Sequence, residues 1–201
     1  NNVPVPPTVP VIDSTKALPV FKNLASYRIT NLWAATKGKS LDVVNDGKKN
    51  KVQLDGSGPY SGQYWTLTPF PGYPGYYRLT NLFLGKDLSL DIVNDGTNNK
   101  ITFGNSGMIS GQAWKITPLP NGYYRLTTNF QGDGKSLDVI NDGKNTQLHL
   151  TKTAQASGQY WLITEITPAN TAPVVPAVPV VPVVPVVDST KALPVFKNLA
   201  S

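Results

Sequence analysis

The chain contains no cysteine, one histidine and one methionine among its 201 residues. The absence of cysteine excludes disulfides, thiolate chemistry and cysteine-based metal sites. Because His149 is the single histidine, the parts for a metal centre or a nucleophilic triad are also lacking. Counting alone leaves a paired-carboxylate hydrolase open, but the candidate carboxylates described below recur three times, which a single active site would not require. We therefore expect a protein that is not an enzyme and that needs no cofactor.

Charge and long apolar runs are also scarce. Charged residues make up 15% of the chain, and its net charge of +6 is spread rather than concentrated. No basic stripe with interleaved aromatic residues occurs, so nucleic acid is not an expected partner. No run approaches the ~18 apolar residues that a membrane span requires. The chain begins with Asn-Asn rather than Met, so we expect an excerpted or processed chain from which any export signal is missing. An extracellular or cell-surface location is expected from the fibre assembly that the tails, described below, predict.

Three short blocks recur three times in a fixed order. They are Tyr-Arg-(Ile/Leu)-Thr, then Ser-Leu-Asp, then Ser-Gly-Gln-x-Trp, the last at residues 61–65, 110–114 and 157–161. The Asp residues of the second block and the Trp residues of the third are both separated by 49 and then 47 residues. A fixed internal period indicates a repeat architecture.

Each repeat has the pattern of short strands. Apolar and polar residues alternate in 27–30, 41–43 and 65–68, and an Asn-Asp-Gly turn follows at 45–47, 94–96 and 141–143. Pro- and Gly-rich joints at 69–76 and 118–122 separate the copies, and no helical apolar period appears. The pattern predicts an all-β domain over 27–167, with four short strands in each of three copies that close into one barrel.

These motifs resemble those of a known family. The Gln-x-Trp that ends each repeat, after Ser-Leu-Asp and an Asp-Gly turn, is similar to that of the ricin B-type (R-type) lectins over residues 27–167. The resemblance implies a β-trefoil with pseudo-threefold symmetry, in which six strands form a barrel and six form capping hairpins. It also implies binding of glycans. Kunitz-type and fungal inhibitor trefoils share the fold without Gln-x-Trp, so a protease inhibitor is a third and weaker alternative.

The resemblance points to Asp42, Asp91 and Asp138 as acceptors of hydrogen bonds from sugar hydroxyls. The alternative is that each Asp caps the turn that follows it. Further candidates lie in the turns and in the third strand of each repeat: Asn45, Asn94, Asn141, Gln53, His149 and Tyr60.

The expected pockets depart from the family pattern. The family places an aromatic ring two residues after a Gln of the third strand, where this chain has Asp55, Gly104 and Thr151. Tyr60 is the candidate substitute in the first copy, and Met108 is a poor equivalent in the second. Two hypotheses therefore remain: a module with weak sugar sites, or a structural subunit whose sugar sites are degenerate. The family's Asn before the Gln of Gln-x-Trp is replaced by glycine at Gly62, Gly111 and Gly158.

Other repeated residues are expected to serve the fold. We predict that the core contains Trp65, Trp114 and Trp161, with Gln63, Gln112 and Gln159 satisfying nearby backbone groups. A third set is expected either to pack or to form stacking surfaces: Trp33, Phe83 and Phe130.

The tails carry a second repeat. Residues 13–26 and 188–201 are identical, at an offset of 175, and proline recurs every third residue in 1–12 and 168–187. Such spacing favours an extended polyproline helix. We predict three parts: 1–26, the trefoil 27–167, and 168–201. We expect the tails to join copies head to tail, or the natural chain to be a tandem array, with contacts through Leu18, Val20, Phe21, Leu193, Val195 and Phe196.

Overall fold

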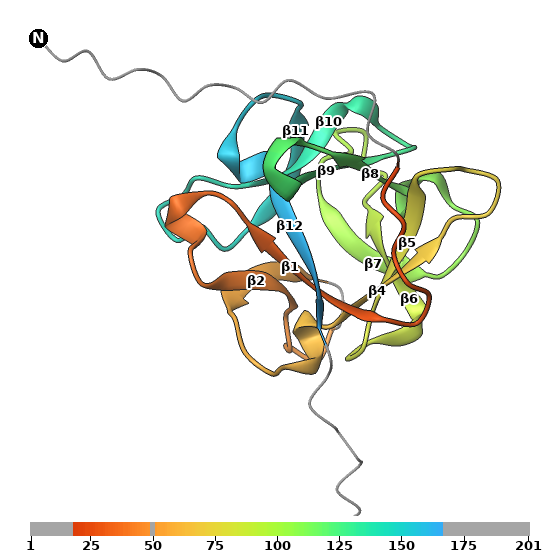
Figure 1. Ribbon diagram of the computed structural model, residues 1–201, viewed down its shortest axis with the longest axis horizontal. Helices are drawn as coiled ribbons and strands as arrows, with labels where there is room; N and C mark the ends of the chain where they lie inside the picture. The colour runs from red at the N-terminus through yellow and green to blue at the C-terminus, as the bar shows by residue number, and fades with distance from the viewer. Residues whose placement is uncertain (1–17, 49–50, 167–201) are drawn as a thin grey trace, which may run out of the picture. The chain divides into compact units, whose positions relative to one another are not determined.

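The computed structural model describes residues 18–48 and 51–166, which form twelve β-strands and five short 3-10 helices (Figure 1). The strands of the first repeat are β1 (Ser26–Asn31), β2 (Lys39–Val43), β3 (Val52–Gly56) and β4 (Trp65–Pro69). Those of the second are β5 (Tyr76–Asn81), β6 (Gly85–Ile92), β7 (Ile101–Asn105) and β8 (Trp114–Pro118). Those of the third are β9 (Tyr124–Thr128), β10 (Gly132–Val139), β11 (Leu148–Lys152) and β12 (Trp161–Ile166). The 3-10 helices are η1 (Ala34–Thr36), η2 (Ser61–Gln63), η3 (Ser110–Gln112), η4 (Pro120–Gly122) and η5 (Ser157–Gln159).

Six strands close into a barrel. Strand β1 pairs with β12 and β4, β5 pairs with β4 and β8, and β9 pairs with β8 and β12, all antiparallel. Closure leaves none of these short strands with an open edge. The hairpins β2–β3, β6–β7 and β10–β11 complete the three repeats. The predicted β-trefoil, with four strands in each of three copies, is confirmed.

The three repeated tryptophans lie in the centre of the core. Trp65, Trp114 and Trp161 have no exposed surface. Each indole Nε1 donates to the carbonyl of the leucine in its own Ser-Leu-Asp block, at 2.9 Å for Leu41, 2.9 Å for Leu90 and 3.1 Å for Leu137. These bonds tie the strand of each Ser-Leu-Asp block to the tryptophan of the same repeat, because a buried indole N–H needs an acceptor.

Both residues of the Asp-Gly pair stabilise the turns after β2, β6 and β10: the glycine by its backbone conformation and the aspartate by its hydrogen bonds. The glycines have φ angles of 77° at Gly47, 84° at Gly96 and 80° at Gly143, which a residue with a side chain rarely adopts. The preceding aspartates accept bonds from turn amides, with donors Lys48 for Asp46, Asn98 for Asp95, and Lys144 and Asn145 for Asp142.

The core extends N-terminal to the predicted start of the trefoil at residue 27. Phe21 is 9% exposed and belongs to the same apolar cluster as Tyr27 and Tyr77. Leu193, Val195 and Phe196 lie outside the described residues. Within 18–48 and 51–166, no helix is long and apolar enough to cross a membrane.

Candidate functional site

Each repeat holds its Ser-Leu-Asp carboxylate in the same way. Asp42 Oδ1 accepts the amide N–H of Val43 at 2.8 Å, and Oδ2 accepts Nε2 of Gln63 at 3.3 Å. The equivalent glutamine–aspartate distances are 2.9 Å for Gln112 and Asp91, and 3.0 Å for Gln159 and Asp138. The carboxylates therefore have fixed orientations, and each oxygen keeps a lone pair for a further donor.

The glutamines also hold the loops before η2, η3 and η5. Gln63 Nε2 donates to the carbonyl of Gly56 at 2.7 Å, and its Oε1 accepts the amide of Gly58 at 2.9 Å. Gln112 and Gln159 make the corresponding pairs of bonds. The Gln of each Gln-x-Trp thus ties its site loop to the carboxylate.

The glycine before each glutamine makes room for the carboxylate. A Cβ atom on Gly62 would lie 2.2 Å from Oδ1 of Asp42. On Gly111 and Gly158 it would lie 2.3 Å from the equivalent oxygens of Asp91 and Asp138. Real Cβ atoms do not approach that closely, so the glycine that departs from the family pattern is required by the position of the aspartate.

The first carboxylate is the most buried of the three. Asp42 is 8% exposed, whereas Asp91 and Asp138 are half-buried. Burial raises the pKa of Asp42, the bonds from Gln63 and the Val43 amide oppose that rise, and the charge of Asp55 adds to it.

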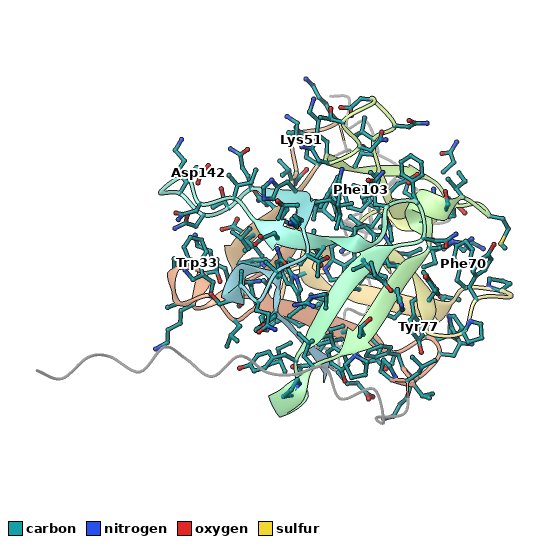
Figure 2. All side chains as sticks on the ribbon, turned by 90° about the horizontal axis from the view of Figure 1, so that it is seen from above. Trp33, Lys51, Phe70, Tyr77, Phe103 and Asp142 are labelled. Carbon is teal, nitrogen blue, oxygen red and sulfur yellow. The ribbon has the colours of Figure 1, made fainter. Side chains whose placement is uncertain are left out.

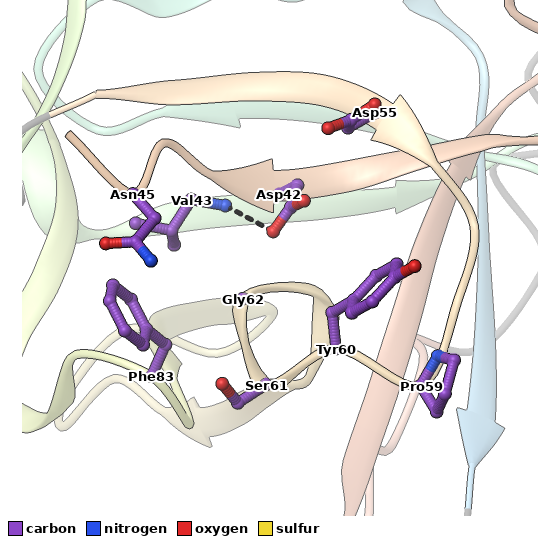
Figure 3. Close-up of a pocket in the computed structure, with 9 residues that line it drawn as sticks. All are labelled: Asp42, Val43, Asn45, Asp55, Pro59, Tyr60, Ser61, Gly62 and Phe83. Atoms are coloured by element: carbon purple, nitrogen blue, oxygen red, sulfur yellow. Dashed lines mark hydrogen bonds between the residues drawn. The ribbon is translucent and has the colours of Figure 1, made fainter.

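A pocket of about 510 Å³ opens beside Asp42 (Figure 3). Its polar wall contains Asn45 and Asp55, and its aromatic wall contains Tyr60 and Phe83. Figure 3 shows these two rings on either side of Gly62, facing the strand that carries Asp42. Tyr60 is 60% exposed, so its ring is open to a ligand.

The second ring of this pocket comes from the next repeat. Phe83 follows β5, the first strand of the second repeat, while Asp42 lies in the first. Besides the pairing of β4 with β5, two bonds join the two repeats next to this pocket, and we call this junction a seam. The Leu82 amide donates to Tyr64 O at 2.9 Å, and Asn81 Nδ2 donates to Gly62 O at 2.8 Å. Phe83 was expected to pack or to form a stacking surface, but the sequence did not place it beside Asp42, because the family pattern has its aromatic residue in the third strand of the same repeat.

The same arrangement recurs in the second repeat. A smaller pocket of about 220 Å³ is lined by Asp91, Asn94 and Ile109, and by Phe130 of the third repeat. The bond from the Asn129 amide to Ala113 O, 2.9 Å, repeats the seam. Met108 is 63% exposed and does not line this pocket.

Trp33 occupies the equivalent position at the third seam. The Leu32 amide donates to Tyr160 O at 2.9 Å, and Asn31 Nδ2 donates to Gly158 O at 2.8 Å. These bonds hold the segment that carries Trp33 against the loop that faces Asp138. The pockets beside Asp42 and Asp91 therefore each contain an aromatic residue from the following repeat.

The remaining candidates lie beside the carboxylates. Gln53 is the strand partner of Asp42, and His149 is the strand partner of Asp138. Gln53 does not line the pocket beside Asp42. Asn141 is exposed in its turn, as Asn45 and Asn94 are in theirs.

Comparisons with known proteins agree with this architecture. Residues 61–150 match the family model described as ricin-type beta-trefoil lectin domain-like. A designed 3-fold symmetric protein, ThreeFoil, is 24% identical and aligns over 70% of this chain and 99% of its own, with a TM-score of 0.59. SeviL, solved bound to asialo-GM1 saccharide, is 18% identical over 71% of this chain and 98% of its own, with a TM-score of 0.54.

Larger proteins contain the same fold as one part. A mosquitocidal holotoxin is 20% identical with a TM-score of 0.63, and the match covers 74% of this chain but 18% of the toxin. Polyporus squamosus lectin, solved bound to Neu5Aca2-6Galb1-4GlcNAc, is 16% identical over 73% of this chain and 50% of its own, with a TM-score of 0.57. No curated protein matches the sequence. The predicted resemblance to the ricin B-type β-trefoil is confirmed.

Proposed function

We propose that this ricin B-type trefoil is a carbohydrate-binding module with up to three weak sites. The observation that carries the proposal is the pairing of Asp42 with the rings of Tyr60 and Phe83 in one open pocket. A sugar presents hydroxyls at its edge and C–H groups on its face. An ionised carboxylate forms strong bonds with the hydroxyls, and an aromatic ring supplies the apolar surface for the face.

We infer a binding role rather than a catalytic one. The carboxylate, glutamine and glycine recur in every repeat with the same bonds, as equivalent binding sites would. The second carboxylate of the first pocket, Asp55, corresponds to Gly104 and Thr151 in the other repeats, so a carboxylate pair is not part of the repeated unit.

Galactose-containing glycans are the first probes. Two of the similar structures are an exo-beta-1,3-galactanase and an endo-β-galactosidase, and the ligand of the Polyporus squamosus lectin contains Galb1-4GlcNAc. We would measure binding on a glycan array and by pull-down with polysaccharides at high protein concentration. Binding should disappear in Asp42→Asn/Asp91→Asn/Asp138→Asn and persist in the exposed control Met108→Ala. A blank array and blank pull-downs for the native chain would refute the lectin function.

We also propose that the chain is the repeating subunit of an extracellular head-to-tail assembly. The identity of residues 13–26 and 188–201 favours it, because one copy can present a second version of its own N-terminal segment. Electron microscopy of the full chain should show filaments or rings, and deletion of 168–201 should abolish them. Filaments of the same form after the deletion would exclude the tail as the connector.

A further inference from the structure

One phenylalanine closes an end of the barrel. The ring of Phe21 packs edge-on against Tyr27 at 5.3 Å and Tyr77 at 5.1 Å, and lies tilted at 5.8 Å from Tyr124, measured between ring centroids. These tyrosines begin the Tyr-Arg-(Ile/Leu)-Thr block of each repeat, so they surround the pseudo-threefold axis. We call them the tyrosine socket. Figure 2 shows Tyr77 on the side of the molecule opposite Lys51, which lies in the β2–β3 loop.

Leu18, Pro19 and Lys22, which lie near Phe21 in the chain, each make a specific contact with the trefoil. The Tyr77 hydroxyl donates to the carbonyl of Pro19, and the amide of Lys22 donates to the Tyr27 hydroxyl at 2.7 Å. Lys22 Nζ pairs with Glu165 at 2.9 Å. Leu18 sits against Gly75, where an added Cβ would come within 3.0 Å of the leucine. We call residues 18–22 the plug.

The plug is not simply an apolar tail covering an apolar surface. Val20 is 92% exposed, while its neighbour Phe21 is 9% exposed. One side chain enters the socket, and backbone bonds on either side fix the direction of the chain. A segment needs this particular order of residues to fit.

The chain contains this order twice. Residues 193–197 repeat Leu-Pro-Val-Phe-Lys, so each chain has two plugs and one tyrosine socket. Because the two segments have the same sequence, residues 193–197 can make the same kinds of contact as residues 18–22. We propose that the tyrosine socket is an exchangeable docking site that accepts the plug at 193–197 of a second copy of this chain. The proposal rests on the assembly proposed above and specifies where the two copies join.

The two plugs compete through their tethers. Their sequences are the same, so we expect the same contacts, and exchange of an identical element between copies has little intrinsic cost. The N-terminal plug is tied to β1 by a few residues, and such a short tether gives an effective concentration of about millimolar. Exchange should therefore be weak in dilute native protein and strong once Phe21 no longer fills the socket.

Two variants with the same core defect test this competition. Phe21→Ala opens the socket and leaves Phe196 to fill it from another copy, whereas Phe21→Ala/Phe196→Ala removes both rings. Sedimentation equilibrium should show oligomers of Phe21→Ala at protein concentrations roughly tenfold below any association of the double variant. Equal masses for the two folded variants across the concentration range would overturn the proposal.

A cysteine pair tests the same contact without emptying the socket. Because the chain has no native cysteine, Lys197→Cys and Glu165→Cys introduce the only thiols, at the counterpart of the Lys22–Glu165 pair. Oxidation at about millimolar protein concentration, where a second copy can compete with the N-terminal plug, should give covalent dimers and longer species. The control pair Lys197→Cys and Lys51→Cys, on the opposite side of the trefoil, should give far fewer.

The outcomes separate the socket from the assembly. Internally cross-linked monomers, or a yield no higher than that of the control pair, would overturn docking on a second copy. Native filaments with no cross-linking at residue 165 would leave the assembly standing and exclude this socket as its joint. Cross-linked dimers with no filaments under the microscope would support the socket and refute the extended assembly.

Discussion

A Cβ atom added to Gly62 would lie 2.2 Å from Oδ1 of Asp42. The same oxygen accepts the amide of Val43, and the other carboxylate oxygen accepts Gln63. The glycine, the aspartate and the glutamine therefore form one unit, because a shift of the carboxylate weakens both bonds. This explains why Gly-Gln and Ser-Leu-Asp recur together in all three repeats.

We predict that Gly62→Ala disables the first pocket. The methyl group must push the carboxylate aside, and overpacking of this kind costs about 1–3 kcal/mol of stability. Urea denaturation measures the stability, and glycan binding measures the pocket. Gly134→Ala is the matched control, because a Cβ there meets nothing within 4 Å. Equal effects of the two substitutions would show that the contact with Asp42 does not matter.

A second prediction concerns the ring supplied across the seam. In an Asp91→Asn/Asp138→Asn background the first pocket is the only one with its carboxylate. There, Phe83→Ala should weaken glycan binding about 5-fold, since an aromatic contact is worth about 1 kcal/mol and about 1.4 kcal/mol corresponds to tenfold. Phe130→Ala removes the same kind of ring from the pocket of Asp91 and should leave binding unchanged. If both substitutions weaken binding equally, each ring acts through the core and not through its pocket.

The sequence predicted the part of the structure that repeats. Trp114, Gln112 and Asp91 occupy equivalent positions in every copy, so their period and order predicted four strands per copy and closure into a trefoil. The ring of Phe83 was predicted only as a packing or stacking residue, because no spacing within one repeat shows that it faces Asp42 of another. That neighbourhood arises only when the barrel closes.

The burial of Phe21 was not predicted, for a different reason. Its segment occurs at both ends of the chain and follows a Pro/Val-rich stretch, which indicates a connector between copies. Its burial depends on three tyrosines that lie far apart in sequence and meet around the axis. Composition cannot reveal a socket made by one residue from each repeat.

Acid should weaken the fold through the three turns. Bonds from the backbone amides of Lys48, Asn98 and Asn145 hold the pKa values of Asp46, Asp95 and Asp142 below their ordinary value. A lowered pKa in the folded state adds stability that is present above the ordinary pKa of about 3.9 and is lost as the pH falls through the lowered values. We predict that Asp46→Asn/Asp95→Asn/Asp142→Asn loses less stability than the native chain between about pH 5 and pH 2.

Asp42→Asn is the control, because it should change the pH dependence of stability in the opposite direction. Burial raises the pKa of Asp42, so the folded protein binds this proton more tightly than the unfolded chain does. The contribution of Asp42 therefore falls as the pH rises from about 3.9 through the raised value. Removing that carboxylate should steepen the gain in stability with rising pH, whereas removing the turn carboxylates should flatten it. Urea midpoints measured across the range distinguish the two slopes, and identical slopes in all three proteins would contradict both assignments.

Two substitutions of Trp114 separate the contribution of its volume to stability from the contribution of its hydrogen bond. Trp114→Ala should cost about 3–5 kcal/mol, because it leaves a large cavity at a site with no exposure. Trp114→Phe keeps most of the apolar contact but removes the donor to Leu90 O, which is buried behind it. A buried carbonyl that loses its partner costs about 1–3 kcal/mol, added to a smaller cavity term.

Trp33→Phe is the control: at a half-buried position, it should cost less stability than Trp114→Phe in the same urea denaturation experiment. Equal losses for these two variants would mean that the bond to Leu90 contributes nothing to the stability of the fold.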